Sequence, residues 1–381
     1  PLYNAEHMLG IISVFMPEAV KKVTFYKGCF PARYGGRLSS VLDLRTNDGN
    51  TEHHCGEVSV SLLSTKFHIE GPVVDSTTTF SFSSRIMNTI LAVPIVQSMD
   101  RKEKGDYWFY DIDGKFTHRF SPRDRISFNV YKGRDKLFFH EDKDYPFTSE
   151  QISNTITDSE MAWGNTQVRA GWDHVYGPSL SSTAFLGYNR FAIKTDISED
   201  FSLCAKDEQV RTISDMEYKS GMDDVSFNID FDLFQSNSHH IRFGVESIFH
   251  VFSPETYGLR SRDYGPDDVV KSDTTMSSAA NNVIRAMEIS TYAEDEICLG
   301  KALSLMTGIR FNVFAARGRS YLSPQPRLAV KYSVCRGVDL KLGYSRMGQN
   351  VHLLTSSRLT LPMDLWVPAT ERIDPMISEQ G

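Results

Sequence analysis

Apolar and polar residues alternate along most of the chain after residue 50. In residues 225–233 every odd position is apolar, and the even positions are Ser, Asn or Asp. Residues 241–251 and 338–344 follow the same two-residue period with few exceptions. This period is typical of a β-strand whose two faces meet different environments. We therefore predict a chain made mainly of strands.

Twelve strands are predicted, separated by turn-forming residues. They cover residues 56–73, 77–88, 106–120, 125–140, 162–176, 181–196, 210–235, 239–252, 284–298, 303–315, 324–335 and 338–348. Short connections at 74–76, 121–124, 177–180, 236–238, 299–302 and 336–337 alternate with longer ones at 89–105, 141–161, 197–209, 253–283 and 316–323. Short turns at one end and longer loops at the other indicate an up-and-down antiparallel barrel with one elaborated mouth.

A soluble β-sandwich with one wetted face would give the same alternation. The number of long strands and the strict alternation of connection lengths favour a transmembrane barrel instead. In such a barrel the apolar faces meet lipid and the charged faces line the lumen. No apolar run approaches 18 residues, so no transmembrane helix is predicted.

Residues 1–50 do not show the long alternating segments of the rest of the chain. Residues 23–26 and 40–45 read as short strands, and residues 17–20 as one helical turn that begins with proline. Between the strands, four Gly and Pro residues at 28, 31, 35 and 36 predict tight, irregular backbone. The turn signal Asn-Asp-Gly-Asn at 47–50 closes this stretch.

The string KGCFPARYGGRLSSVLDLRTNDGN, with the preceding HMLGIISVFMPEAV, resembles the end of the plug domain of TonB-dependent outer-membrane receptors. The strings LLSTKFHIEGP (62–72), YWFYDIDGK (107–115) and LPMDLWVP (361–368) are similar to barrel or loop segments of the same family. The resemblance implies an all-β fold: the C-terminal part of a plug domain (1–50), then the N-terminal part of a barrel (51–381). About 12 of about 22 strands would be present. Both ends look cut, so we expect a fragment.

By resemblance, the expected function is energy-coupled import of a scarce ligand across the outer membrane of a Gram-negative bacterium. The ligand could be a siderophore, cobalamin, a glycan or a peptide. The implied partners are the TonB energy-transducing complex, reached through an N-terminal segment outside this sequence, outer-membrane lipid and, as an open alternative, a surface lipoprotein. Two other functions compete: a passive porin or adhesin barrel, and a soluble β-rich binding protein or enzyme.

Composition narrows these alternatives. The formal net charge is −7, the pI is about 5.9 and the basic residues are scattered, which argues against a nucleic-acid partner. The five cysteines are isolated, so they indicate neither a disulfide framework nor a zinc site. No phosphate-binding, dinucleotide, zinc-protease or serine-hydrolase motif occurs. We expect no catalytic residues, no cofactor and no metal.

Two sets of residues are candidates for function. Three arginines fall in the plug-like stretch, and a guanidinium enclosed by a barrel favours a carboxylate partner on a polar strand face. The hypothesis is a plug–barrel latch formed by Arg33, Arg37 and Arg45 with Glu70, Asp230, Asp232 and Glu246. The alternative is that the arginines are only hydrated.

The second set lies in the long connection 253–283, because loops at a barrel mouth carry recognition. The candidate ligand contacts are Arg260, Arg262, Asp263, Tyr264, Asp267 and Asp268. The alternative is a variable surface loop.

Overall fold

The computed structural model describes residues 2–7, 10–88, 103–148, 151–204, 209–265, 269–278, 283–300, 302–356 and 363–381. One antiparallel sheet dominates it. Its path runs β21-β18-β17-β16-β15-β13-β12-β11-β10-β9-β8-β7-β6-β5, and β14 adds to β13 as a fifteenth strand. Three two-stranded sheets, β1-β2, β3-β4 and β19-β20, stand apart from it. The prediction of an all-β fold is confirmed.

The strands of the main sheet have the following bounds. They are β5 (Cys55–Val60), β6 (Ser64–Val74), β7 (Thr78–Met87), β8 (Glu103–Arg119), β9 (Asp124–Thr148), β10 (Gln151–Val175), β11 (Leu180–Cys204), β12 (Gln209–Phe234), β13 (His239–Tyr264), β14 (Val270–Ser278), β15 (Ile284–Leu299), β16 (Leu303–Ala316), β17 (Arg319–Cys335), β18 (Val338–Gln349) and β21 (Met376–Gln380). The smaller elements are β1 (Glu6–His7), β2 (Ile12–Ser13), η2 (Pro17–Ala19), β3 (Val20–Lys27), β4 (Ser40–Thr46), η3 (Asp75–Thr77), β19 (Val351–Ser356) and β20 (Met363–Pro368).

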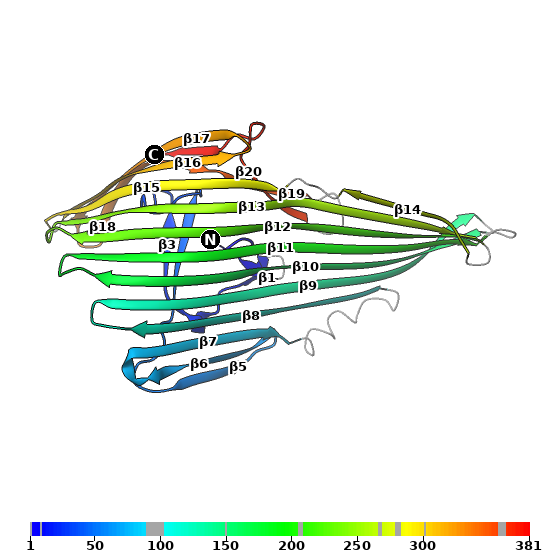
Figure 1. The fold of residues 1–381 in the computed structure, drawn as a ribbon, viewed down its shortest axis with the longest axis horizontal. Coiled ribbons are helices and arrows are strands. Elements are labelled where there is room, and N and C mark those ends of the chain that lie inside the picture. The colour runs from blue at the N-terminus through cyan, green and yellow to red at the C-terminus, as the bar shows by residue number, and fades with distance from the viewer. Residues whose placement is uncertain are drawn as a thin grey trace.

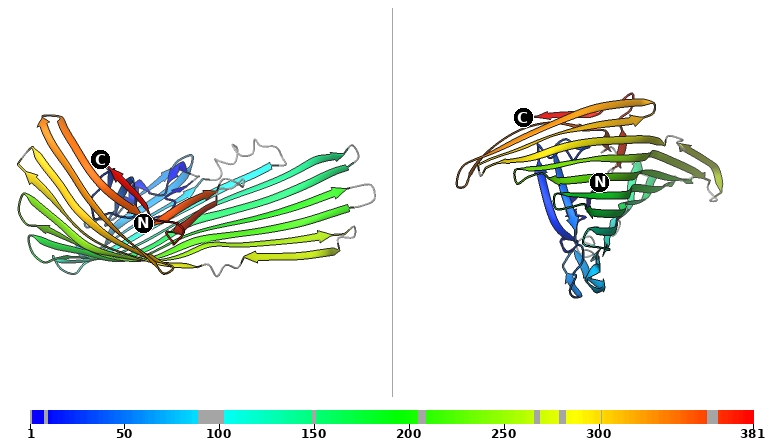
Figure 2. Two further views of the ribbon diagram at one scale, coloured as in Figure 1. Left: turned by 90° about the horizontal axis from the view of Figure 1, so that it is seen from above. Right: turned by 60° about the vertical axis from the view of Figure 1, so that its left-hand side comes forward.

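The sheet is an open, curved wall (Figure 1). Its edges, β5 and β21, are not paired with each other, as expected of a partial barrel. Figure 2 shows the N-terminal segment, residues 2–50, on the concave side of this wall. A buried apolar cluster that includes Trp163, Phe191 and Phe314 lies on the same side, with Tyr3 packed into it. No helix in the described part of the chain has the length and hydropathy needed to span a bilayer.

The strands at the long-connection end are much longer than predicted. Strands β9 to β13 each have 25 or 26 residues, which is about 80 Å at the usual rise per residue. Most of the predicted connections 141–161 and 197–209 belong to these strands, as do residues 253–264. Their polar composition suggested loops. A strand with water on both faces, however, can carry polar side chains on both, as the cross-strand pair of Arg211 with Asp200 illustrates.

Three other predictions need correction. Residues 56–73 form two strands, because Ser61 and Ser64 close a tight turn in which Ser61 N–H donates to the Ser64 carbonyl (3.0 Å). The apolar pair at 62–63 hid this turn. The connection 316–323 shrinks to Arg317 and Gly318, both with positive φ, so the alternation of connection lengths is not strict. The strands β19, β20 and β21 were not predicted. The six short connections are confirmed, with shifts of one or two residues.

The N-terminal segment agrees closely with its prediction. η2 is the expected helical turn, and β3 pairs with β4 in an antiparallel hairpin. The connection between the two strands turns sharply at Gly28 and Gly36, each with φ of +69°. A side chain would be strained at both positions.

Candidate functional site

The N-terminal segment is fastened to the concave wall by side chains at several points. Arg33, in the loop between β3 and β4, makes the most elaborate of these contacts. Its backbone N–H and its guanidinium both donate to the carboxylate of Glu294 on β15, at 3.1 and 2.5 Å. Glu294 is 5% exposed, so this is a charge-assisted contact in a largely desolvated place. Tyr34 packs against the same guanidinium, and its hydroxyl donates to Asp43 (2.7 Å).

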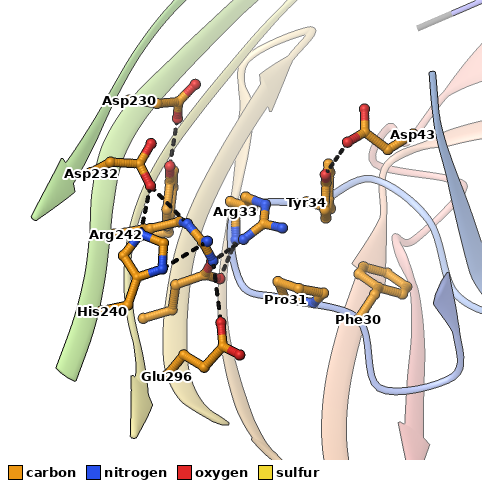
Figure 3. Close-up of polar contacts among 12 residues, drawn as sticks. Phe30, Pro31, Arg33, Tyr34, Asp43, Asp230, Asp232, His240, Arg242 and Glu296 are labelled. Carbon is orange, nitrogen blue, oxygen red and sulfur yellow. Dashed lines mark hydrogen bonds and ion pairs between the residues drawn. The ribbon is translucent and has the colours of Figure 1, made fainter. Parts of the chain in front are cut away.

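Glu294 also has a cation of its own in the wall. Arg242 on β13 lies 3.6 Å from the Glu294 carboxylate and donates to Asp232 (2.8 Å). His240 completes this group, with its Nε2 at 2.9 Å from Asp232. Figure 3 shows Arg33 facing Arg242, His240 and Asp232. The carboxylate that holds Arg33 would therefore not be left without a cation if Arg33 moved away.

Two buried arginines of the wall hold the backbone of the same loop. Arg310 donates to the Arg33 carbonyl (3.1 Å), and Arg327 donates to the Phe30 carbonyl (2.9 Å). A Cβ atom at Gly35 would overlap the Arg310 guanidinium. Close approach of the loop to the wall thus requires glycine at this position.

His7 forms a second attachment point. Its Nδ1 lies 2.8 Å from Asp135 on β9, and its Nε2 lies 2.9 Å from both oxygens of Asp111 on β8. The ring is 1% exposed and stacks on Phe109. Because ionised carboxylates only accept hydrogen bonds, both ring nitrogens must donate, and the imidazole is held as its cation. Burial lowers the pKa of His7, but the hydrogen bonds to the two carboxylates outweigh it and the net direction is upward.

Asp111 also has a second cation. Arg85 on β7 donates to it through Nε (2.8 Å) and Nη2 (2.6 Å). Tyr131 adds a third donor at 2.8 Å. Asp111 therefore remains paired within the wall whether or not His7 is present.

Tyr3 makes the third attachment in the same manner. Its hydroxyl donates to Asp224 on β12 (2.7 Å), and its backbone exchanges two hydrogen bonds with the Asn165 amide. Asp224 is also 2.6 Å from Nδ1 of His250, which is buried in the wall. At these three attachments four wall carboxylates hold the segment. Three of them are shared with a basic side chain of the sheet: Glu294 with Arg242, Asp111 with Arg85, and Asp224 with His250. The fourth, Asp135, accepts from the Tyr107 hydroxyl.

In the fourth attachment the carboxylate belongs to the N-terminal segment and the wall supplies the cations. Asp48, just after β4, receives hydrogen bonds from Lys115 (2.7 Å) and Lys21 (2.9 Å) and lies 3.5 Å from Arg125. Burial raises the pKa of Asp48, but these cations lower it by more, so the net direction is well below the usual range. Arg125 has a second carboxylate, Asp173, at 2.7 Å. We call these four attachments the clasp.

The predicted latch residues are only partly brought together. Arg33 contacts the wall, but its partner is Glu294, which the prediction did not include. Arg37 donates to the neighbouring Gly36 carbonyl (2.8 Å), and Arg45 has no ion pair within the residues described.

The predicted carboxylates have other partners. Glu70 does contact the segment, but it accepts from Asn47 (2.6 Å) and not from an arginine. Asp230 accepts from Tyr292, Asp232 pairs with Arg242, and Glu246 with Arg310. The reason is register: these side chains already face basic or hydroxyl groups on neighbouring strands. The function of the latch itself stays a prediction.

Four of the six predicted ligand-contact residues lie on β13, which pairs with β14 and β12, and not on an irregular loop. Arg260 pairs with Asp273 (2.7 Å) and Arg262 with Asp215 (2.7 Å). Asp263 accepts from Thr212, and Tyr264 packs against Arg211. Asp267 and Asp268 lie outside the described residues.

Sequence reasoning missed most of the clasp. His7 is predicted only as the first residue of a string similar to the plug family, and Tyr3 is not singled out. The isolated His beside an apolar run at 8–15 was an available signal, because a histidine that follows the chain into a buried place needs polar partners. The alternating carboxylates of β15 were another, since Glu288, Glu294 and Tyr292 share the concave face. No local pattern could have identified which of them meets Arg33.

Comparison with known proteins gives one family match. Residues 98–354 match the family described as "TonB dependent receptor-like, beta-barrel". The search of curated proteins returned no match.

Among solved structures, the chain is similar to BauA, the ferric preacinetobactin receptor from Acinetobacter baumannii, with 10% identity and a TM-score of 0.47 over 95% of this chain and 57% of that one. It is also similar to a chain of the RagAB peptide transporter, with 9% identity and a TM-score of 0.47 over 81% of this chain and 40% of that one. The ferripyoverdine receptor of Pseudomonas aeruginosa matches at 8% identity and a TM-score of 0.26 over 94% and 69% of the two chains. The present chain therefore spans between two fifths and three fifths of the length of the first two.

Proposed function

The chain belongs to the TonB-dependent receptor-like β-barrel family, and on that premise we propose that it is part of an energy-coupled importer in the outer membrane of a Gram-negative bacterium. Residues 1–50 are the C-terminal part of its plug, and residues 51–381 are part of its barrel wall. The plug closes the lumen until a pull from the TonB complex rearranges it. The import of a small, scarce ligand follows from that rearrangement.

The observation that carries the proposal is the shared carboxylates of the clasp. Removing one partner of a buried ion pair usually costs about 3–5 kcal/mol, because a buried charge is left without compensation. Glu294, Asp111 and Asp224 avoid this cost, since Arg242, Arg85 and His250 stay beside them in the wall. A plug held in this way is fixed at rest, and on release these three carboxylates keep a cation beside them. Asp135, the other partner of His7, keeps the hydrogen bond from the Tyr107 hydroxyl. A passive pore would have no need of such an arrangement.

The ligand-contact surface is proposed to be the paired strands β13 and β14, which lie on the long-connection side. Arg260 and Arg262 on β13 are the candidate contacts, with their partners Asp273 and Asp215. The class of ligand, among siderophore, cobalamin, glycan and peptide, is left to uptake assays with each. The same uptake assays, run with and without a candidate surface lipoprotein, test whether the protein has such a partner.

The first test is fractionation of the full-length protein, with heat-modifiable gel mobility as the readout. We expect recovery in the outer membrane and a heat-dependent shift. Recovery in a soluble fraction without a shift would remove the membrane placement and restore the soluble alternative.

The latch is tested by charge reversal at Arg33 and Glu294. Each single change, Arg33→Glu or Glu294→Arg, is expected to impair regulated uptake, and the double change should restore part of it. Arg45→Glu is the matched control, because Arg45 lies in the same segment without an ion pair in the described structure. Strictly additive defects in the double variant would mean that the pair is not a latch.

A further inference from the structure

Basic side chains gather on the convex face of β9, β11 and β12, away from the clasp. Inward-facing residues such as Tyr131 and Asp135 are buried, and the residues between them point outward. The outward cations are Lys132, Arg134 and Lys136 on β9, Arg190 and Lys194 on β11, and Lys219 on β12. Strand register brings them together, because Lys132 and Arg190 flank Thr166 of β10 on either side.

Five of these side chains, all except Lys136, rim a groove of about 380 Å³ that runs across β9 to β13. Its floor consists of small residues: Ala162 and Gly164 on β10, Ala192 on β11 and Gly221 on β12. Neighbouring strands lie about 4.8 Å apart, so the backbones of Lys132 and Arg190 are about 10 Å apart across this floor. That spacing leaves room for a phosphate group between two long basic side chains.

The six cations occupy three cross-strand rows. The row farthest from the short turns is neutralised: Lys136 pairs with Glu160 (2.9 Å), Lys194 with Asp196 (2.6 Å) and Lys219 with Glu217 (2.6 Å). The two rows nearer the short turns are not.

In these two rows, Lys132 and Arg134 have no carboxylate within 4.0 Å among the residues described. Arg190 has only Asp223, at 3.9 Å. We call Lys132, Arg134 and Arg190 the basic triad. These three side chains give this part of the groove a net positive charge that nearby carboxylates do not neutralise.

The basic triad lies directly above an apolar belt. In the next cross-strand row toward the short turns, Val130 pairs with Val168, and Tyr188 with Val225. The row after that contains Phe128, Leu186 and Phe227.

On β8, the rings of Trp108 and Tyr110 stack beside Lys136 and Arg134. Aromatic rings at the edge of an apolar band mark the membrane–water boundary of a barrel. Because the triad is on the side of the long connections, that boundary is the one with the outer leaflet.

We propose that this groove binds the phosphate of an anionic glycolipid headgroup in the outer leaflet, with the basic triad as its ligands. The inference rests on the membrane placement given under Proposed function. Basic pockets at the level of the headgroups attract anionic lipids, and burial of the acyl chains against the adjacent apolar belt adds to the affinity. The neutralised row above leaves the triad as the preferred place for the phosphate.

The test measures binding of purified, phosphorylated lipid A to the full-length protein in detergent. The triple variant Lys132→Gln, Arg134→Gln, Arg190→Gln should bind at least about tenfold more weakly, since each cation near a membrane surface contributes to attraction. The matched control is Arg123→Gln, Arg336→Gln, Lys341→Gln, which removes the same charge from exposed positions at or near the short-turn end. It should bind like the wild type. Heat-modifiable mobility verifies that each variant is folded.

Three results would overturn the proposal: undiminished binding by the triple variant, equal binding of dephosphorylated lipid A, or equally tight binding of inorganic phosphate, which would mean an adventitious ion only. If the triple variant does not fold, Ala192→Glu places a carboxylate on the groove floor and should weaken lipid binding in the same way. A folded barrel that imports ligand but ignores the lipid overturns this inference alone. Recovery of the protein in a soluble fraction overturns the function as well.

Discussion

The N-terminal segment and the wall that surrounds it are held by different kinds of interaction. Neighbouring strands of the wall are joined by continuous backbone hydrogen bonds, as in β10 and β11, which pair over 24 positions. The segment is joined to the wall by side chains, through the clasp residues Tyr3, His7, Arg33 and Asp48 and through further contacts such as Asn47 with Glu70 and Glu18 with Lys66. A ladder of backbone bonds opens only cooperatively, whereas a side-chain contact can exchange one partner for another. The segment can therefore detach from the wall without opening the sheet.

Hydrogen exchange, read separately for residues 2–50 and for the strands, measures both sides of this comparison. Each change below is made in the full-length protein. Each should alter the protection of the segment and leave the protection of the wall unchanged.

The largest effect is expected from His7→Leu. This change removes charge-assisted hydrogen bonds to Asp111 and Asp135, and we expect the free energy of opening of the segment to fall by about 3 kcal/mol. The wall should keep its protection, because Arg85 still pairs with Asp111. Loss of protection in β8 and β9 to the same extent would show that His7 supports the wall itself.

A smaller effect of the opposite kind is expected from Arg242→Gln. Without Arg242, Glu294 has Arg33 as its remaining cation within the described residues. Release of the segment, the proposed plug, should then cost about 1.4 kcal/mol more, and the proposed uptake should be about tenfold slower. The hydrogen-exchange protection of residues 2–50 should stay the same or increase. Faster exchange in the segment would contradict the role of Arg242 as a replacement partner.

The pH dependence of protection is expected to be weaker still. The pKa of His7 is raised on folding, so its contribution is complete below the unfolded value near 6.5 and is lost as the pH rises through the folded value. The pKa of Asp48 is lowered, so its contribution is present above its unfolded value and is lost only as the pH falls through the folded one. Attachment of the segment should therefore be strongest in mildly acidic solution. His7→Leu should abolish the decline on the alkaline side, and its persistence would assign that decline to another group.

The smallest effect is expected from Arg260→Gln on β13. Arg260 and Asp273 form an exposed pair on the convex side of the long strands, and exposed pairs contribute little. Thermal unfolding and segment protection should both be unchanged. A measurable loss of either would mean that the β13–β14 hairpin is coupled to the clasp.

Much of the fold could be predicted from the sequence because its signals are local. The two-residue period marks strands wherever one face is apolar, and Gly, Pro, Asn and Asp mark the short turns. The same local rule failed toward the long connections, where β9 to β13 are richer in polar residues and apolar positions no longer alternate over a long run. There the pairing of one strand with the next maintains the extended conformation, and that pairing depends on residues far apart in the sequence.

The site was less predictable for the same reason. Arg33 was identified from its place in a glycine-rich stretch, but its partner lies 261 residues away in sequence. Which concave-face carboxylate it meets depends on the curvature of the whole sheet and on the path of the loop. Asp230, Asp232 and Glu246 were reasonable candidates by sidedness, yet each already has a partner on a neighbouring strand.

The β3–β4 hairpin has a mechanical consequence. Val20, where the hairpin begins, pairs with Thr46, where it ends, and Asp48 anchors the chain just beyond. A force applied from the N-terminal side would load one cross-strand pair at a time, starting with Val20, so the hairpin would unzip and not shear. Unzipping requires a much smaller peak force than shearing the same number of bonds together. The chain reaches its hairpin only after Tyr3 and His7, so tension would detach the contacts one after another along the sequence.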